Sequence, residues 1–142
     1  MRYLLDTNVV SELRRSRPDP QVVRWFDGLD HADLMLSVLT VAEIHQGVER
    51  LRRRDPAQAD GIAAWLDQLV ASFADKIIPV GMGVAFRWAE LNAQRPLPVV
   101  DGLLAATALE QGAVLVTRNV RDLVGTGVEL LNPFDPDGLD LR

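Results

Sequence analysis

The sequence of 142 residues contains no cysteine, one lysine (Lys76) and two histidines, His31 and His45. The absence of cysteine excludes structural disulfides, thiolate metal sites and a cysteine nucleophile. Two histidines are too few for a three-histidine metal site. Several common kinds of catalytic and metal centre are therefore excluded before any motif is considered.

Long hydrophobic runs are also missing. The apolar start Tyr3-Leu4-Leu5 is interrupted by Asp6 and Asn8, which is too early for the apolar region of a signal peptide. No segment approaches the roughly 18 uninterrupted apolar residues that a membrane helix needs. The sequence therefore predicts a cytoplasmic protein that does not enter a membrane.

The length and composition are those of one soluble domain. Hydrophobic residues make up 48% and charged residues 25% of the chain, which excludes the disordered and collagen-like classes. No linker, repeat or low-complexity stretch divides the sequence. We expect one domain over residues 1–134 and a loose tail over 135–142, where Pro136 and Gly138 stand among acidic residues.

The net charge of −5 argues against a protein that holds nucleic acid by a general positive field. A local positive field remains open, because the arginines gather in two clusters: Arg14, Arg15 and Arg17, then Arg50, Arg52, Arg53 and Arg54. The planar guanidinium group fits phosphate oxygens in pairs. The same clusters also suit solvated helix ends, where cations interact favourably with the helix dipole.

Short apolar runs alternate with longer segments of helical spacing. Five runs are predicted as strands, at Tyr3–Leu5, Leu34–Val38, Ile77–Val80, Val114–Thr117 and Val128–Leu131. Helices are predicted over Val9–Arg14, from Pro20, around Val41–Leu51, from Pro56, around Val84–Leu91 and over Asp101–Gln111. Strands separated by helices need crossover connections. We therefore expect a three-layer α/β/α domain with a central parallel sheet of about five strands.

Polar residues stand where several predicted strands end. Asp6 directly follows the first strand, and Glu43 lies in the first turn of the helix after the second. Asp101 begins a later helix, and Asn119 and Asp122 follow the fourth strand. Because ligands bind beyond the carboxyl ends of parallel strands, we expect these side chains to lie near one edge of the sheet.

The acids in this group point to a divalent cation. Two bare carboxylates about 4 Å apart repel each other by roughly 4 kcal/mol at an effective dielectric constant of about 20. Three converging acids therefore need protons or a cation, and Mg²⁺ or Mn²⁺ prefers carboxylate and water ligands. A metal held in this way supports phosphodiester hydrolysis.

Each of these residues also has a purely structural interpretation. Asp6 is a favoured helix cap, while Glu43 and Asp101 suit the first turn of a helix. Asn119 and Asp122 are common in turns. No single residue decides between the two interpretations.

Four segments in register resemble one family. They are Tyr3–Glu12 (YLLDTNVVSE), Leu36–Ile44 (LSVLTVAEI), Asp101–Ala108 (DGLLAATA) and Val116–Leu123 (VTRNVRDL). They are similar to PIN-domain ribonucleases, and within these to VapC toxins of type II toxin-antitoxin pairs, particularly the FitB-like branch. The resemblance implies an endoribonuclease that depends on Mg²⁺, with Mn²⁺ as an alternative. It also implies a homodimer that a VapB-type antitoxin inhibits.

The resemblance also implies roles for individual residues. It places catalysis and metal binding on Asp6, Glu43 and Asp101, with Asp6 and Asp101 as the direct ligands. Many family members have a fourth acid where this chain has Asn119, and Asp122 is an alternative source of that charge. The hydroxyl and amide groups expected to orient the carboxylates are those of Thr7, Asn8, Ser11 and Thr117.

Two rival functions are weighed against this one. An aspartate-nucleophile phosphatase needs a second aspartate two residues after the first, where this chain has Asn8. A PIN-fold binding module that has lost catalysis but still dimerises and binds an antitoxin is favoured by Asn119 and by the acidic net charge. The retention of Asp6, Glu43 and Asp101 counts against this second rival.

Overall fold

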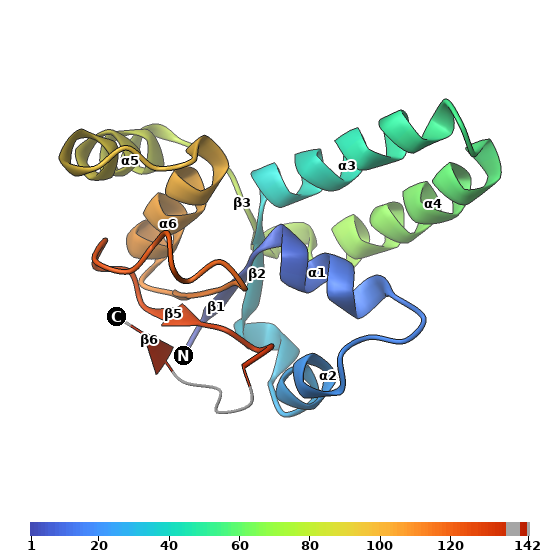
Figure 1. Cartoon of the computed structure of the whole chain (residues 1–142), viewed down its shortest axis with the longest axis horizontal. Coiled ribbons are helices and arrows are strands. Elements are labelled where there is room, and N and C mark those ends of the chain that lie inside the picture. The colour runs from blue at the N-terminus through green and yellow to red at the C-terminus, as the bar shows by residue number, and fades with distance from the viewer. Residues whose placement is uncertain (136–139, 142) are drawn as a thin grey trace.

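A six-stranded sheet in the order β3-β2-β1-β4-β5-β6 runs through the molecule (Figure 1). This computed structural model describes residues 1–135 and 140–141. The first five strands are parallel, and β6 is antiparallel to β5. The strands are β1 (Tyr3–Leu5), β2 (Leu34–Ser37), β3 (Ile77–Ile78), β4 (Val114–Val116), β5 (Leu130–Leu131) and β6 (Asp140–Leu141). The prediction of a parallel sheet of five strands is confirmed, with one antiparallel strand added.

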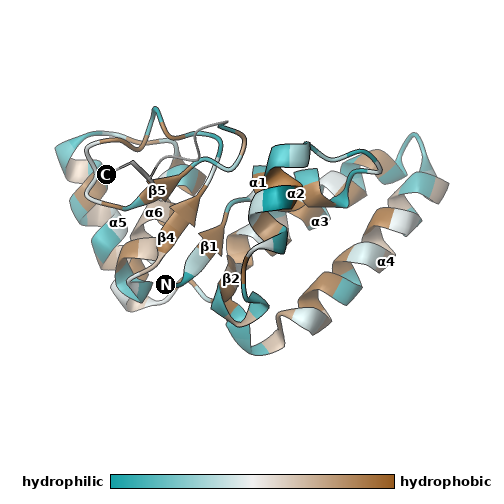
Figure 2. Ribbon diagram, turned by 90° about the horizontal axis from the view of Figure 1, so that it is seen from below, coloured by the Kyte–Doolittle hydropathy of each residue, from teal (hydrophilic) through white to brown (hydrophobic). Residues whose placement is uncertain are grey.

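Helices cover both faces of the sheet, which confirms the three-layer arrangement. One face is covered by α1–α4 and the other by α5 and α6. The helices α3 and α4 pair with each other and project from the sheet as an arm (Figures 1 and 2). The α-helices are α1 (Thr7–Arg14), α2 (Pro20–Asp27), α3 (Val38–Arg52), α4 (Pro56–Ser72), α5 (Met82–Gln94) and α6 (Val99–Gln111). Short 3₁₀ helices precede β2 and β3, at His31–Asp33 and Ala74–Lys76.

The strands divide their side chains between two cores. Successive residues of a strand point to opposite faces of the sheet. Leu4 and Leu115 therefore join the core beneath α5 and α6, whereas Leu5 and Val116 join the core beneath α1–α4. All four side chains are buried. Burial on both faces explains why these strands are continuous apolar runs in the sequence.

The predicted position of Glu43 in a first helical turn is wrong. The Ser37 side chain accepts a hydrogen bond from the backbone N–H of Leu39 and caps α3, so the helix begins at Val38, inside the predicted strand. Glu43 consequently lies in the second turn of α3. The helix α6 also begins earlier than predicted, at Val99, so Asp101 is the third residue of the helix rather than the first.

The predicted tail over 135–142 is described only in part. Residues 136–139 and 142 lie outside the described residues, while Asp140 and Leu141 form β6 beside β5. In the described part of the chain, no helix is both long enough and apolar enough to cross a membrane.

The strand order reverses at β1. The chain passes from β1 to β2 and β3 on one side and then places β4 against the other side of β1. In open α/β sheets, ligand sites form at such a reversal, beyond the carboxyl ends of the strands. Asp6 and Thr117 directly follow β1 and β4, so the fold places both at this point.

Candidate active site

Asp6 is buried at the end of β1, with a side chain exposed by only 5%. Its Oδ1 accepts a hydrogen bond of 2.6 Å from the backbone N–H of Thr7, which caps α1. Its Oδ2 accepts bonds from Asn8 Nδ2 at 3.2 Å and from Thr117 Oγ1 at 2.6 Å. Asp6 is thus a helix cap and, at the same time, a buried carboxylate held in one orientation by three donors.

A chain of hydrogen bonds joins Asp6 to Asp101. The Thr117 hydroxyl donates to Asp6 and accepts from the backbone N–H of Asn119 at 3.0 Å. Asn119 Nδ2 in turn donates to Asp101 Oδ2 at 2.7 Å. The loop after β4 therefore links the Asp6 carboxylate, which follows β1, to the Asp101 carboxylate in the first turn of α6.

Glu43 enters the same region from α3. Thr7 Oγ1 donates to Glu43 Oε1 at 2.5 Å and lies 3.3 Å from the hydroxyl oxygen of Thr40. Thr40 is fully buried and lies one helical turn before Glu43. The sequence analysis missed Thr40, although a hydroxyl three residues before a candidate acid on a helix is a signal that could have found it.

The three acids share one electrostatic environment. Burial raises the pKa of Asp6 above its ordinary value, although the hydrogen bonds from Thr117 and Thr7 lower it. The negative charges of Asp101 and Glu43 raise the pKa further. Burial also raises the pKa of Asp101 against the hydrogen bond from Asn119, with the charges of Asp122 and Glu43 adding to the increase. The ionised forms of Asp6 and Asp101 are therefore disfavoured, chiefly because both carboxylates are buried and secondly because negative charges lie near them.

The raised pKa of Asp101 predicts how stability depends on pH in EDTA. Between the ordinary pKa of aspartate, about 4, and the raised value, the folded chain binds more protons than the unfolded chain, so the free energy of unfolding falls as pH rises. Asp101→Asn removes the titrating carboxyl group and therefore this pH-dependent loss of stability. We expect the melting temperature of the variant, relative to wild type, to increase as the pH rises above about 4, the ordinary pKa of aspartate.

Thermal denaturation of the two proteins across this pH range measures the difference. Asp67→Asn, which neutralises an exposed carboxylate on α4, is the matched control. A difference between Asp101→Asn and wild type that does not change with pH contradicts the prediction.

Two predicted residues form no hydrogen bond with these acids in the described part of the chain. Asp122 is exposed, and its backbone oxygen accepts a hydrogen bond from Arg95. Ser11 lines a cavity beside Thr7 and Glu43, but within residues 1–135 it donates no hydrogen bond to a carboxylate. Asn119, rather than Asp122, therefore contacts Asp101 directly.

The acids do not form a ready metal-binding cluster. In the part of the chain that the structure describes, no three histidine, aspartate or glutamate side chains are close enough together to hold a metal ion. The carboxylates instead accept hydrogen bonds from Thr7, Asn119 and Thr117. The charges of Asp101 and Glu43 nevertheless lie near enough to raise the pKa of Asp6, and that of Glu43 near enough to raise the pKa of Asp101.

Comparison with known proteins finds matches over most of the chain. Residues 3–123 match the PIN domain family. The VapC ribonuclease Y4jK of Sinorhizobium fredii is 31% identical over 143 residues, covering 94% of this chain and 98% of that protein. Toxin FitB of Neisseria gonorrhoeae is 33% identical over 137 residues, covering 92% of this chain and 97% of that protein. The crystal structure of FitAcB from Neisseria gonorrhoeae superposes with a TM-score of 0.86 at 33% identity, over 93% of this chain and 98% of that one.

Proposed function

Because the chain belongs to the PIN domain family, we propose that it is a metal-dependent endoribonuclease and the toxin of a VapBC-type toxin-antitoxin pair. The observation that carries this proposal is the hydrogen-bonded network that joins Asp6 to Asp101 at the reversal of strand order, with Glu43 beside it. Relatives that align over nearly the whole chain and are named as a ribonuclease and a toxin support it.

The donor set fits a hard divalent cation, Mg²⁺ or Mn²⁺. Its charged groups are carboxylates, which these ions prefer, and burial and mutual repulsion raise the pKa values of Asp6 and Asp101. Among the described residues, Glu43 Oε2 and Asp101 Oδ1 accept no hydrogen bond and remain available as ligands. Asp6, Glu43 and Asp101 would hold the ion, which supplies a nucleophilic water and stabilises the leaving oxygen.

Other residues of this chain position the three carboxylates. Thr7, Asn8 and Thr117 hold Asp6 and Glu43 in place through the bonds described above. Asn119 stands where many PIN domains have a fourth acid, and its amide orients Asp101 without adding negative charge. Glu43, whose Oε1 is held by Thr7, would contribute Oε2 as a ligand of the ion. The scissile bond is a phosphodiester bond of RNA.

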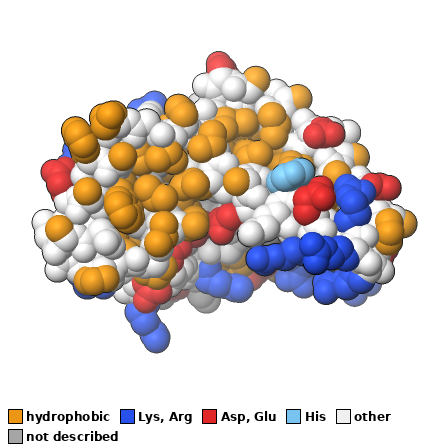
Figure 3. Space-filling model, turned by 90° about the horizontal axis from the view of Figure 1, so that it is seen from above, with side chains coloured by type: hydrophobic (Ala, Val, Ile, Leu, Met, Phe, Trp, Pro, Cys, Tyr) orange, Lys and Arg blue, Asp and Glu red, His pale blue; other side chains and the backbone are white. Residues whose placement is uncertain are grey.

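The proposed partners are an antitoxin and a second copy of the chain. Support for the antitoxin comes from the similarity to Toxin FitB and to the FitAcB structure. A hydrophobic surface on the α5–α6 half of the molecule is available for a homodimer, with Met82, Phe86 and Val99 each more than 60% exposed (Figure 3). The mass of the purified chain in solution tests this, and a strictly monomeric protein contradicts the dimer.

Cleavage of RNA by the purified chain tests the proposed activity. We expect labelled RNA to be cut in the presence of Mg²⁺ or Mn²⁺ and to remain intact when EDTA is added, because the acids need a cation to act. In parallel, Mn²⁺ should raise the melting temperature of the wild type and not that of Asp6→Asn. Absence of cleavage in a folded protein, with equal thermal shifts for both, would favour the non-catalytic binding module.

A further inference from the structure

A groove leads away from Glu43 between α1, α3 and α4. A cavity of about 260 Å³ is lined at one end by Thr7 and Glu43, and its wall also includes Arg14 and Arg54. A second cavity of about 390 Å³ shares Arg14 and Ile62 with the first and continues along α4. The candidate active site thus opens into an extended depression with basic side chains in its wall.

Gly47 keeps this groove open. It lies one turn after Glu43 in the interior of α3 and lines the 260 Å³ cavity. A Cβ atom built on Gly47 meets nothing within 4 Å, so no neighbouring group requires a glycine there. A glycine inside a helix costs about 1 kcal/mol relative to alanine. The missing side chain leaves open space in the cavity wall one helical turn from Glu43.

The arginines of the groove differ from their neighbours in having no carboxylate within ion-pair distance among the described residues, although the Arg14 guanidinium carbon lies 6.0 Å from the centroid of the Trp65 ring. Arg15 and Arg52 from the same two clusters form ion pairs, Arg15 with Glu12 and Arg52 with Glu49 and Asp60. Within residues 1–135, neither Arg14 nor Arg54 forms an ion pair. This local positive charge is notable in a chain whose net charge is −5.

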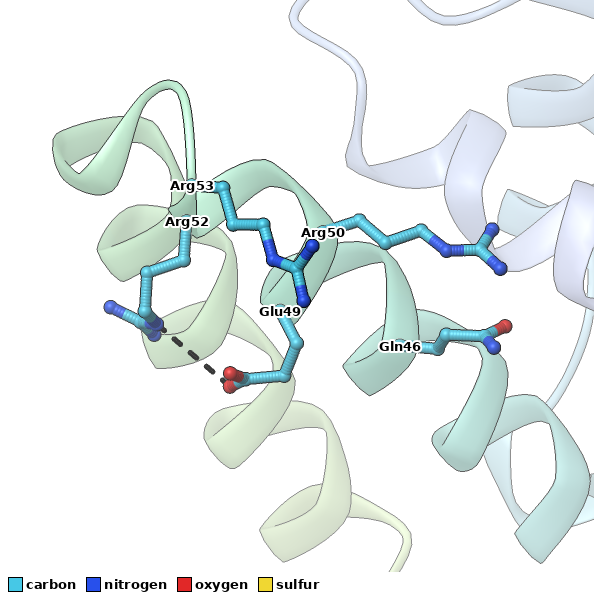
Figure 4. Close-up of a pocket in the computed structure, with 5 residues that line it drawn as sticks. All are labelled: Gln46, Glu49, Arg50, Arg52 and Arg53. Carbon is cyan, nitrogen blue, oxygen red and sulfur yellow. Dashed lines mark ion pairs between the residues drawn. The ribbon is translucent and has the colours of Figure 1, made fainter.

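Further arginines of α3 line a separate pocket. Arg50 and Arg53 belong to a pocket of about 420 Å³ near the end of α3, which shares no lining residue with the groove. Arg52 turns toward Glu49 in that pocket, whereas Arg50 extends in the opposite direction (Figure 4). Basic side chains form a continuous band on the α3–α4 half of the face shown in Figure 3.

We propose that the groove lined by Arg14, Gly47 and Arg54 binds backbone phosphates of a single RNA strand and so directs a neighbouring phosphodiester to Glu43 and Asp6. The proposal rests on the ribonuclease function proposed above. Guanidinium groups fit phosphate oxygens in pairs, and a groove that reaches Glu43 suits a polyanion that is cut beside it. An acidic polypeptide is the rival occupant.

Binding of a short fluorescein-labelled oligouridine in EDTA, measured by fluorescence anisotropy over a range of salt concentrations, tests the groove without cleavage. We expect Arg14→Gln/Arg54→Gln to weaken binding and to reduce the slope of log affinity against log salt by about 1.4, since each phosphate contact on a single strand contributes about 0.7. The charge-matched control is Arg24→Gln/Arg87→Gln, on α2 and α5, which should bind like wild type.

Gly47→Leu provides a second variant that fills the groove without changing its charge. It should weaken oligouridine binding while the melting temperature is retained, because leucine is a better helix former than glycine. The proposal is overturned if both groove variants bind oligouridine like the control pair. It is also overturned if Arg14→Gln/Arg54→Gln weakens the binding of polyglutamate but not the binding of oligouridine.

The failure of this proposal is distinguishable from failure of the ribonuclease function. If Asp101→Asn binds oligouridine but no longer cleaves RNA, while the groove variants bind normally, only the assignment of the groove as the RNA-binding surface is wrong. If wild type does not cleave RNA at all, the ribonuclease function is wrong whatever the groove binds.

Discussion

Asp101→Asn is expected to slow RNA cleavage by about 100- to 1,000-fold, the range associated with losing one group of a site that stabilises charge in the transition state. The amide keeps the shape of the side chain and one oxygen that can accept the hydrogen bond from Asn119. It removes the negative charge that the proposed metal requires. The loss should therefore appear in activity while the fold is retained.

Initial rates of RNA cleavage with saturating Mn²⁺, together with the melting temperature, measure this effect. Asp67→Asn makes the same chemical change on the exposed side of α4 and should cleave at the wild-type rate. Undiminished cleavage by Asp101→Asn would show that the chemistry has been assigned to the wrong place.

Thr117→Val is expected to reduce Mn²⁺ affinity and cleavage by about 10- to 100-fold, the usual effect of removing a group that orients a metal ligand. Valine has nearly the shape of threonine but cannot donate to Asp6 Oδ2 or accept from the N–H of Asn119. Both carboxylates of the network lose part of their support, although Thr117 itself contacts neither metal nor RNA in the proposed mechanism.

Titration of the melting temperature with Mn²⁺ separates positioning from general destabilisation. Thr117→Ser retains the hydroxyl and should restore most of the Mn²⁺ affinity. If Thr117→Val binds Mn²⁺ as wild type does, or if Thr117→Ser is as impaired as Thr117→Val, Thr117 does not position Asp6.

The position of the acids explains a compromise between stability and activity. Burial and like charges raise the pKa values of Asp6 and Asp101, so their ionised forms oppose folding at neutral pH. The three donors to Asp6 offset part of this cost and hold the carboxylate in place. Natural sites often retain such strain where a charged ligand is bound.

The arginine clusters show where local sequence could not decide. Both clusters were compatible with phosphate binding and with ordinary helix ends. The structure separates their members, because Arg52 pairs with Asp60 across the α3–α4 turn whereas Arg14 and Arg54 line the groove. Partners such as Asp60 are selected by the packing of two helices, which spacing along one helix does not report.

Sequence alone determined the layers, the parallel strands and the candidate acids. Continuous apolar strands must be buried on both faces, and the carboxyl ends of parallel strands share one edge, so Asp6, Thr117 and Asn119 were expected together. Tertiary structure alone decided which groups form hydrogen bonds: Thr7 with Glu43 and Asn119 with Asp101, whereas among the described residues neither Ser11 nor Asp122 forms one with these acids. Hydrogen bonds depend on distances of a few tenths of an ångström between side chains from different elements. Residue type and spacing indicate an edge of the sheet, whereas only the packed helices place individual atoms there.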